Sequence, residues 1–148
     1  MNKSDIIKEL HTLVDQKLQS AEKAIISATE SRDSDGKSSM GDKYETNRAM
    51  MQIEIGNQEK KKAQLLHLKA DLNRINLDRT NNKVEFGSMV HTSQGVYFLG
   101  IGIGMIKVLQ QTIFAISVSA PIAQAMMGLK LGDRFNFNGK TQEILSLS

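Results

Sequence analysis

Hydrophobic positions in the first half of the chain recur every seven residues, the spacing of helices that pack along a narrow seam. In residues 4–31 the repeat runs through Ile7, Val14, Ala21 and Ala28, with Leu18 and Ile25 as a second row. In residues 42–77 the equivalent positions are Tyr44, Met51, Leu65 and Leu72, with Leu68 and Ile75 beside them. A polar loop at 32–45 joins the two segments, so we predict a long antiparallel helical hairpin over residues 1–80.

The second helical segment has a weaker seam at its middle. Polar side chains interrupt its apolar rows at Glu54, Gln58 and Lys61. We expect Ile53 and Ile55 to compensate there.

Residues 81–148 show a different pattern, with short apolar runs separated by turn residues. The runs at 84–91, 95–101 and 112–118 predict strands, and Asn138-Gly139 between 133–137 and 140–145 is a strong hairpin signal. Pro121 and Gly128 suit the first position and the C-terminal cap of a short helix. The glycines of 100–104 lack the strand–loop–helix setting of a phosphate loop, so we interpret them as strand and turn. The predicted fold class is α+β: a hairpin followed by a small antiparallel sheet with one short helix.

Composition supports this division and excludes several kinds of chemistry. Residues 1–81 hold 27 of the 35 charged residues, and residues 82–148 hold six of the seven aromatic residues. The net charge of +3 is too small to favour nucleic acid as the main ligand. The absence of cysteine excludes disulfides, thiolate metal sites and cysteine nucleophiles, and the three histidines form no metal-ligand pattern. With no signal-like or membrane-spanning apolar run, we expect a cytoplasmic monomer that does not contact membranes.

The candidate chemistry lies in the polar loop. Asp42 and Glu45 are three residues apart where the second helix begins, so they share one of its faces. A hairpin holding two carboxylates at its end could deliver hard oxygen ligands to a metal in another molecule. The same spacing suits a capping box, with Asp42 as N-cap and Glu45 at N3, and both interpretations remain open.

Several motifs resemble the Gre family of bacterial transcript cleavage factors. The segment Ile116-Ser117-Val118-Ser119-Ala120-Pro121-Ile122-Ala123-Gln124-Ala125-Met126-Met127-Gly128, with Gly132-Asp133 after it, is similar to the C-terminal signature of that family. Val84-Glu85-Phe86-Gly87-Ser88-Met89-Val90 resembles its opening strand, and Asn138-Gly139-Lys140 with Glu143-Ile144 resembles its closing hairpin. At the loop, Gly41-Asp42-Lys43-Tyr44-Glu45 matches the Gly-Asp-x-x-Glu of the family.

The resemblance implies a coiled-coil hairpin joined to an FKBP-like domain. It implies that the domain binds bacterial RNA polymerase, with Ser119, Ala120, Pro121 and Ile122 in the contacting segment. The coiled coil would enter the secondary channel and reach the 3′ end of backtracked RNA. Asp42 and Glu45 would then help to hold a catalytic Mg²⁺ of the polymerase, which the chain alone binds too weakly to retain. The chain would be a cofactor of the polymerase's nuclease activity and not an enzyme itself.

Two departures from the family pattern keep other functions open. The loop before Gly41 is longer and rich in serine, and Thr46-Asn47-Arg48 follows Glu45 where the family has Asn-Ala-Glu-Tyr. One alternative is a channel-binding regulator or inhibitor without cleavage activity. Another is an FKBP-like prolyl isomerase or chaperone module, which would need an aromatic-lined pocket.

Overall fold

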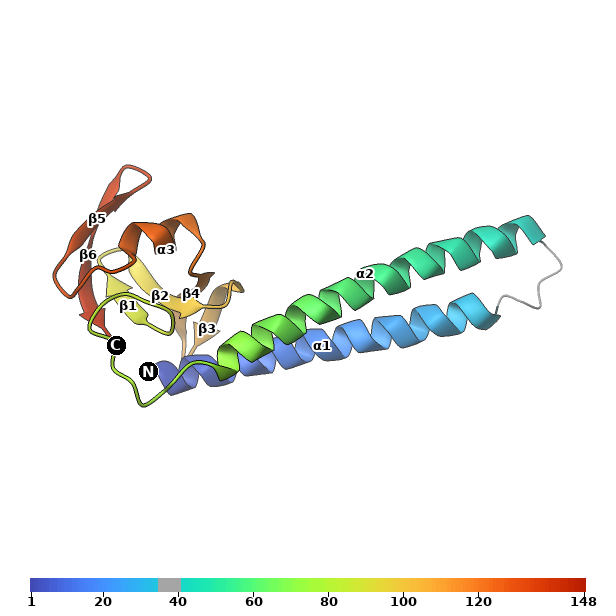
Figure 1. Cartoon of the computed structure of the whole chain (residues 1–148), viewed down its shortest axis with the longest axis horizontal. Helices are drawn as coiled ribbons and strands as arrows, with labels where there is room; N and C mark the ends of the chain where they lie inside the picture. Colours follow the sequence, from blue (N-terminus) through green and yellow to red (C-terminus); the bar gives the residue numbers. More distant parts are fainter. Residues whose placement is uncertain (35–40) are drawn as a thin grey trace. The chain divides into compact units, whose positions relative to one another are not determined.

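The computed structural model of the chain describes residues 1–34 and 41–148, with the side chain of Asp42 excepted. The elements follow one another as two long helices, four strands, a short helix and two strands. They are α1 (Lys3–Ser34), α2 (Gly41–Asn73), β1 (Met89–Thr92), β2 (Gly95–Gly100), β3 (Gly104–Val108), β4 (Gln111–Ser117), α3 (Pro121–Met126), β5 (Arg134–Phe137) and β6 (Lys140–Leu147) (Figure 1). The predicted α+β class is confirmed at this level.

The chain forms two compact units. Residues 12–69, the larger parts of α1 and α2, make one unit, and residues 1–11 together with 70–148 make the other. The sequence groups residues 1–11 and 70–80 with the hairpin, whereas the structure places them in the unit of the sheet.

Within residues 12–69 the two helices run antiparallel, as predicted. Interhelical contacts join Asp15 to Lys69 (2.8 Å), Glu22 to Lys62 (3.5 Å) and Arg32 to Gln52 (2.8 Å). Residue numbers therefore rise along one helix as they fall along the other, and the two helices lie side by side (Figure 1).

The buried residues of this unit follow the predicted seam, with one exception. Val14, Leu18, Ala21 and Ala28 are buried in α1, and Ile55 and Leu65 are buried in α2. Of the two isoleucines expected to repair the middle of the seam, Ile55 is buried and Ile53 is 66% exposed. The reason is helical periodicity, since residues two apart lie on opposite sides of a helix.

The six strands form a sheet in the order β3-β4-β2-β1-β6-β5. All neighbours are antiparallel except β2 and β4, which are parallel. The prediction of a wholly antiparallel sheet is therefore wrong at this pair. After β2 the chain passes to the sheet edge as β3, and β4 returns by a hairpin to the vacant place between β3 and β2. This return gives β4 the direction of β2.

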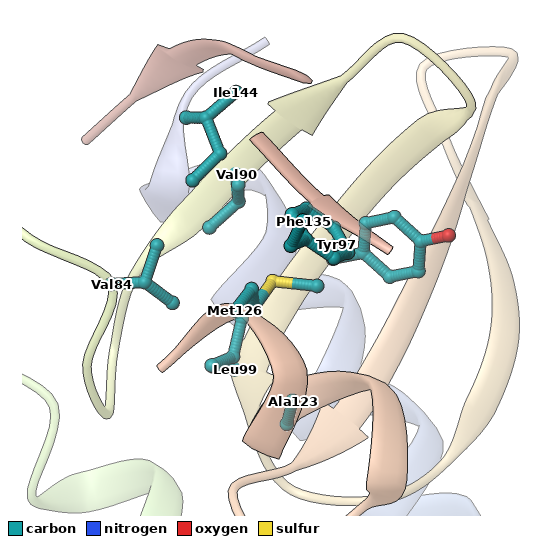
Figure 2. Packing of buried hydrophobic residues seen from close by; sticks show 8 residues of the cluster. All are labelled: Val84, Val90, Tyr97, Leu99, Ala123, Met126, Phe135 and Ile144. Carbon is teal, nitrogen blue, oxygen red and sulfur yellow. The ribbon is translucent and has the colours of Figure 1, made fainter. Parts of the chain in front are cut away.

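One face of the sheet packs on α3 and holds a hydrophobic core. The cluster contains Val84, Val90, Tyr97, Leu99, Ala123, Met126, Phe135 and Ile144. Figure 2 shows Met126 from α3 among Val90, Leu99 and Phe135. Pro121 opens α3 at its first turn, as predicted, and Gly128 follows the helix with φ +80°.

One predicted strand is shorter than the sequence indicates. The run at 84–91 pairs as a strand only from Met89, because Val84 exchanges hydrogen bonds with Gly128 and Leu129 (2.8 Å each) and Gly87 turns the backbone at φ +87°. The glycine repeat at 100–104 ends β2 and starts β3, in agreement with strand and turn. The Asn138-Gly139 hairpin is confirmed, with both residues at positive φ (51° and 77°).

Among the described helices, none combines the length and the apolar character needed to cross a membrane.

Candidate functional site

The predicted carboxylate pair lies at the start of α2, which begins at Gly41. Asp42 and Glu45 are therefore the second and fifth residues of this helix. In a capping box the N-cap residue precedes the helix, whereas Asp42 is inside α2. The Asp42 side chain lies outside the described part of the chain, as do residues 35–40 of the loop.

Glu45 has the exposure that delivery to another molecule requires. Its side chain is exposed, and two exposed cations, Lys43 and Arg48, are on the same turns of α2. Arg48 donates a hydrogen bond from Nη1 to the hydroxyl of Tyr44 (3.1 Å). The Tyr44 hydroxyl is therefore bonded to a residue of its own helix.

The end of α1 contributes a contact that the sequence analysis did not anticipate. Arg32 donates from Nε to Asp33 (3.0 Å) and from Nη1 to Gln52 of α2 (2.8 Å). The hydrogen bond from Arg32 lowers the pKa of Asp33, with a smaller contribution from the charge of Arg48. Arg32 thus connects the two helices next to the loop and favours the ionised form of Asp33. The adjacency of Arg32 and Asp33 in the sequence is the signal that could have predicted the ion pair.

The donor set suits a hard cation but does not enclose one. Within the described side chains no group of three or more His, Cys, Asp or Glu residues could hold a metal ion. Mg²⁺ is usually bound by one or two protein carboxylates together with water and phosphate oxygens. One or two carboxylates at this turn therefore fit a metal ion whose remaining ligands come from another molecule.

The second candidate region, Ser119 to Ile122, comprises the end of the turn before α3 and the first two residues of that helix. Ser119 and Pro121 are exposed, whereas Ala120 and Ile122 are half-buried and pack against the core cluster. Of these four residues, only Ser119 and Pro121 are therefore exposed to solvent.

Hydrogen bonds hold this turn in a defined shape. The hydroxyls of Ser117 and Ser119 are 2.6 Å apart, and the Ser119 N–H donates to the Ser117 oxygen (3.1 Å). The Gln124 side chain donates to the carbonyl of Val118 (2.5 Å). Ala120 stands at the N-cap and makes no side-chain cap bond. The turn is a preformed surface feature next to the hydrophobic core.

The aromatic residues of the sheet unit pack mainly in its interior. Tyr97, Phe98 and Phe135 are buried, and Tyr97 stacks on Phe114 with ring centroids 5.5 Å apart. These rings contribute to the core, which leaves less aromatic surface for a substrate pocket.

No protein-family model matches this chain, and no curated protein or solved structure matches it either.

Proposed function

We propose that this chain is a Gre-like transcription elongation factor that stimulates Mg²⁺-dependent cleavage of backtracked RNA by bacterial RNA polymerase. The observation that carries the proposal is the order of four motifs along the chain: the Gly41–Glu45 turn, the 84–90 segment, the 116–128 signature and the Asn138-Gly139 hairpin. We further propose that the sheet unit has an FKBP-like fold. The antiparallel helices and the mixed sheet with α3 are compatible with both statements.

In this proposal the chain supplies ligands and not a complete active site. Asp42 and Glu45 would share a Mg²⁺ with the polymerase, and that ion would support hydrolysis of the phosphodiester. Their spacing of three residues near the start of α2 would hold both on one helix face. The neighbouring cations Lys43 and Arg48 would offset the repulsion between these carboxylates and RNA phosphates.

The turn before α3 would bind the polymerase. Ser119 and Pro121 would make the contact, while Ala120 and Ile122 would keep the turn in place through the core cluster. Because the hydroxyl pair of Ser117 and Ser119 is already formed, little conformational entropy would be lost on binding.

The test is RNA cleavage in a stalled, backtracked elongation complex with Mg²⁺, with and without the chain. We expect RNA shortening that depends on the chain, and a loss of at least a hundredfold in rate with Asp42→Asn or Glu45→Gln. Polymerase affinity should change less than threefold in both variants. Glu59→Gln, an exposed acid further along α2, is the matched control and should behave like the wild-type chain.

A channel-binding regulator without cleavage activity is the second candidate. The sequence Thr46-Asn47-Arg48 after Glu45 favours it, because the family pattern has Asn-Ala-Glu-Tyr there. It would bind the same polymerase and slow elongation without shortening RNA. If the chain neither binds polymerase nor alters elongation, both candidates are wrong, and isomerisation of a proline-containing model peptide tests the isomerase alternative.

A further inference from the structure

Residues 74–88 connect α2 to β1 without forming a helix or strand, and we call them the strap. The second part of the strap is well anchored. Val84 is fully buried and exchanges backbone hydrogen bonds with Gly128 and Leu129 (2.8 Å each). The Gly87 N–H donates to the carbonyl of Leu99 (2.6 Å). This part is fixed by the core and by the sheet.

The first part of the strap lacks this support. Residues 76–80 are all exposed. The Arg79 N–H and the Asp78 N–H both donate to Asn76, so these bonds stay inside the stretch. A cavity of about 520 Å³, open to solvent, is lined on one side by residues 77–80 and on another by residues 1–4. A stretch of chain beside a cavity gains few dispersion contacts, so packing contributes little to holding it.

A buried lysine holds this stretch instead. Lys3, in the first turn of α1, is only 8% exposed, which is rare for lysine unless its charge is paired. Its Nζ donates to the carbonyl of Arg79 (3.2 Å). With the Asn81 amide oriented so that its oxygen faces donors and its nitrogen faces an acceptor, Nζ also donates to that oxygen (3.1 Å).

The contacts of Lys3 continue into a polar cluster of the strap. In the same orientation Asn81 donates to Glu85 (2.9 Å), and Arg79 donates to the same carboxylate oxygen (2.7 Å). Ser88, which is fully buried, accepts from the Glu85 N–H (2.9 Å). Lys3 is the member of this cluster that comes from outside the strap, so it joins the strap to α1.

We propose that the Lys3 ammonium holds residues 76–83 of the strap against the start of α1. Without this ammonium, residues 76–83 open locally while the sheet stays folded. The proposal does not depend on the function proposed above. It follows from the contrast between the two parts of the strap. Backbone hydrogen bonds to the core and the sheet fix one part, whereas side-chain contacts hold the other, and among these the contacts of Lys3 are the ones that reach α1.

The electrostatic surroundings of Lys3 indicate that its contact with the strap is of moderate strength. Burial lowers the pKa of Lys3, the carboxylate of Glu85 opposes this shift, and the guanidinium of Arg79 adds to it. The charge is therefore held at a cost and is compensated in part by Glu85. Such a contact favours one arrangement without making its opening as costly as global unfolding.

The first test is amide hydrogen exchange on the full chain with Lys3→Met, which keeps the aliphatic stem and removes the ammonium. We expect exchange at Asp78 and Arg79 to become at least tenfold faster, because the carbonyl of Arg79 and the side chain of Asn81 lose a hydrogen-bond donor. Exchange at Ile144, whose N–H bonds to Asp133 within the sheet unit, should change less than twofold. Lys83→Met is the matched control, since Lys83 is an exposed lysine of the strap itself.

Limited proteolysis gives an independent readout. Trypsin needs an extended, locally unfolded chain, and every variant keeps the site after Arg79. Cleavage there should be at least tenfold faster in Lys3→Met than in the wild-type or Lys83→Met chains. The proposal would be overturned if Lys3→Met showed the same exchange rate at Arg79 and the same cleavage rate after Arg79 as the wild-type chain. Equal acceleration at Arg79 and Ile144 would also overturn it, because the strap would then open only with the whole unit.

Discussion

At the scale of single residues, Arg32 has the most specific arrangement near the loop. It pairs with Asp33 and reaches Gln52 on the other helix, so one side chain affects both an acid and the packing of the hairpin. Neither contact required a special sequence motif. The ion pair could be predicted from adjacency, but the contact to Gln52 depends on the helix register, which the weak seam at Glu54 and Gln58 leaves undetermined.

We expect Arg32→Met to raise the pKa of Asp33 towards its ordinary value, because the first cause of the lowering is the Arg32 hydrogen bond. The unfolded chain binds more protons than the folded chain between the lowered and the ordinary pKa. The pair therefore stabilises the fold above the ordinary pKa, near 4 for a carboxyl, and that contribution is lost as pH falls through the lowered value. NMR titration of the Asp33 carboxyl carbon checks this, with Lys23→Met as a control that should leave the titration unchanged.

A second residue-scale prediction concerns the core under α3. Leu99 is fully buried in the cluster, and Leu99→Ala should cost about 2–5 kcal/mol of unfolding free energy through lost burial and a residual cavity. Leu145 is the same residue type on β6 but is 57% exposed, so Leu145→Ala should cost less than about 0.5 kcal/mol. Urea denaturation of the two variants gives the comparison. Similar losses at both positions would contradict the described burial.

At the scale of elements, the features set by local sequence patterns were predictable, and the order of the strands in the sheet was not. The seven-residue repeat gives the hairpin, and Asn138-Gly139 gives the β5–β6 turn, because each rests on a local rule. The parallel pairing of β2 with β4 depends on where β3 lies, and no local signal fixes the order of strands in a sheet. The 84–88 segment has the composition of a strand, yet Val84 exchanges hydrogen bonds with residues after α3, and only Gly87 and Ser88 bond to Leu99 of β2.

Replacing glycine with alanine should have opposite effects on stability at two positions of the chain. Gly139 has φ +77°, so Gly139→Ala should destabilise the sheet unit by about 1–2 kcal/mol. Gly56 lies inside α2 at an ordinary φ, and a Cβ there would meet no atom within 4 Å. Gly56→Ala should therefore stabilise the helix by about 0.5–1 kcal/mol. Thermal unfolding followed by circular dichroism measures both, and the same sign for the two changes would contradict this account.

At the scale of the whole molecule, short sequence motifs suggest the candidate site, whereas no local pattern marks the boundary between the units. Asp42, Glu45 and the Ser119–Ile122 segment rest on such motifs and stay predictions. The buried cluster of Lys3, Asn81 and Ser88 was missed, since polar residues far apart in sequence give no periodic signal. All three residues belong to the unit that contains the sheet. The boundary predicted from the sequence, between residues 80 and 81, therefore separates residues that share one unit.

This division predicts how the chain can be shortened. The first turns of α1 and the end of α2 contribute Ile6, Ile7, Leu10 and Leu72 to the buried residues of the sheet unit. Each such side chain contributes about 1.5–3 kcal/mol when it is fully removed from water. A chain that starts at residue 82 lacks all four and should unfold at a markedly lower urea concentration, or bind a hydrophobic dye in the absence of urea. A chain in which about eight Gly and Ser residues replace residues 12–69 keeps them and should unfold cooperatively at a higher urea concentration. If both shortened chains unfold at the same midpoint, then residues 1–11 and 70–81 are dispensable for the sheet and the boundary predicted from sequence is the thermodynamic one.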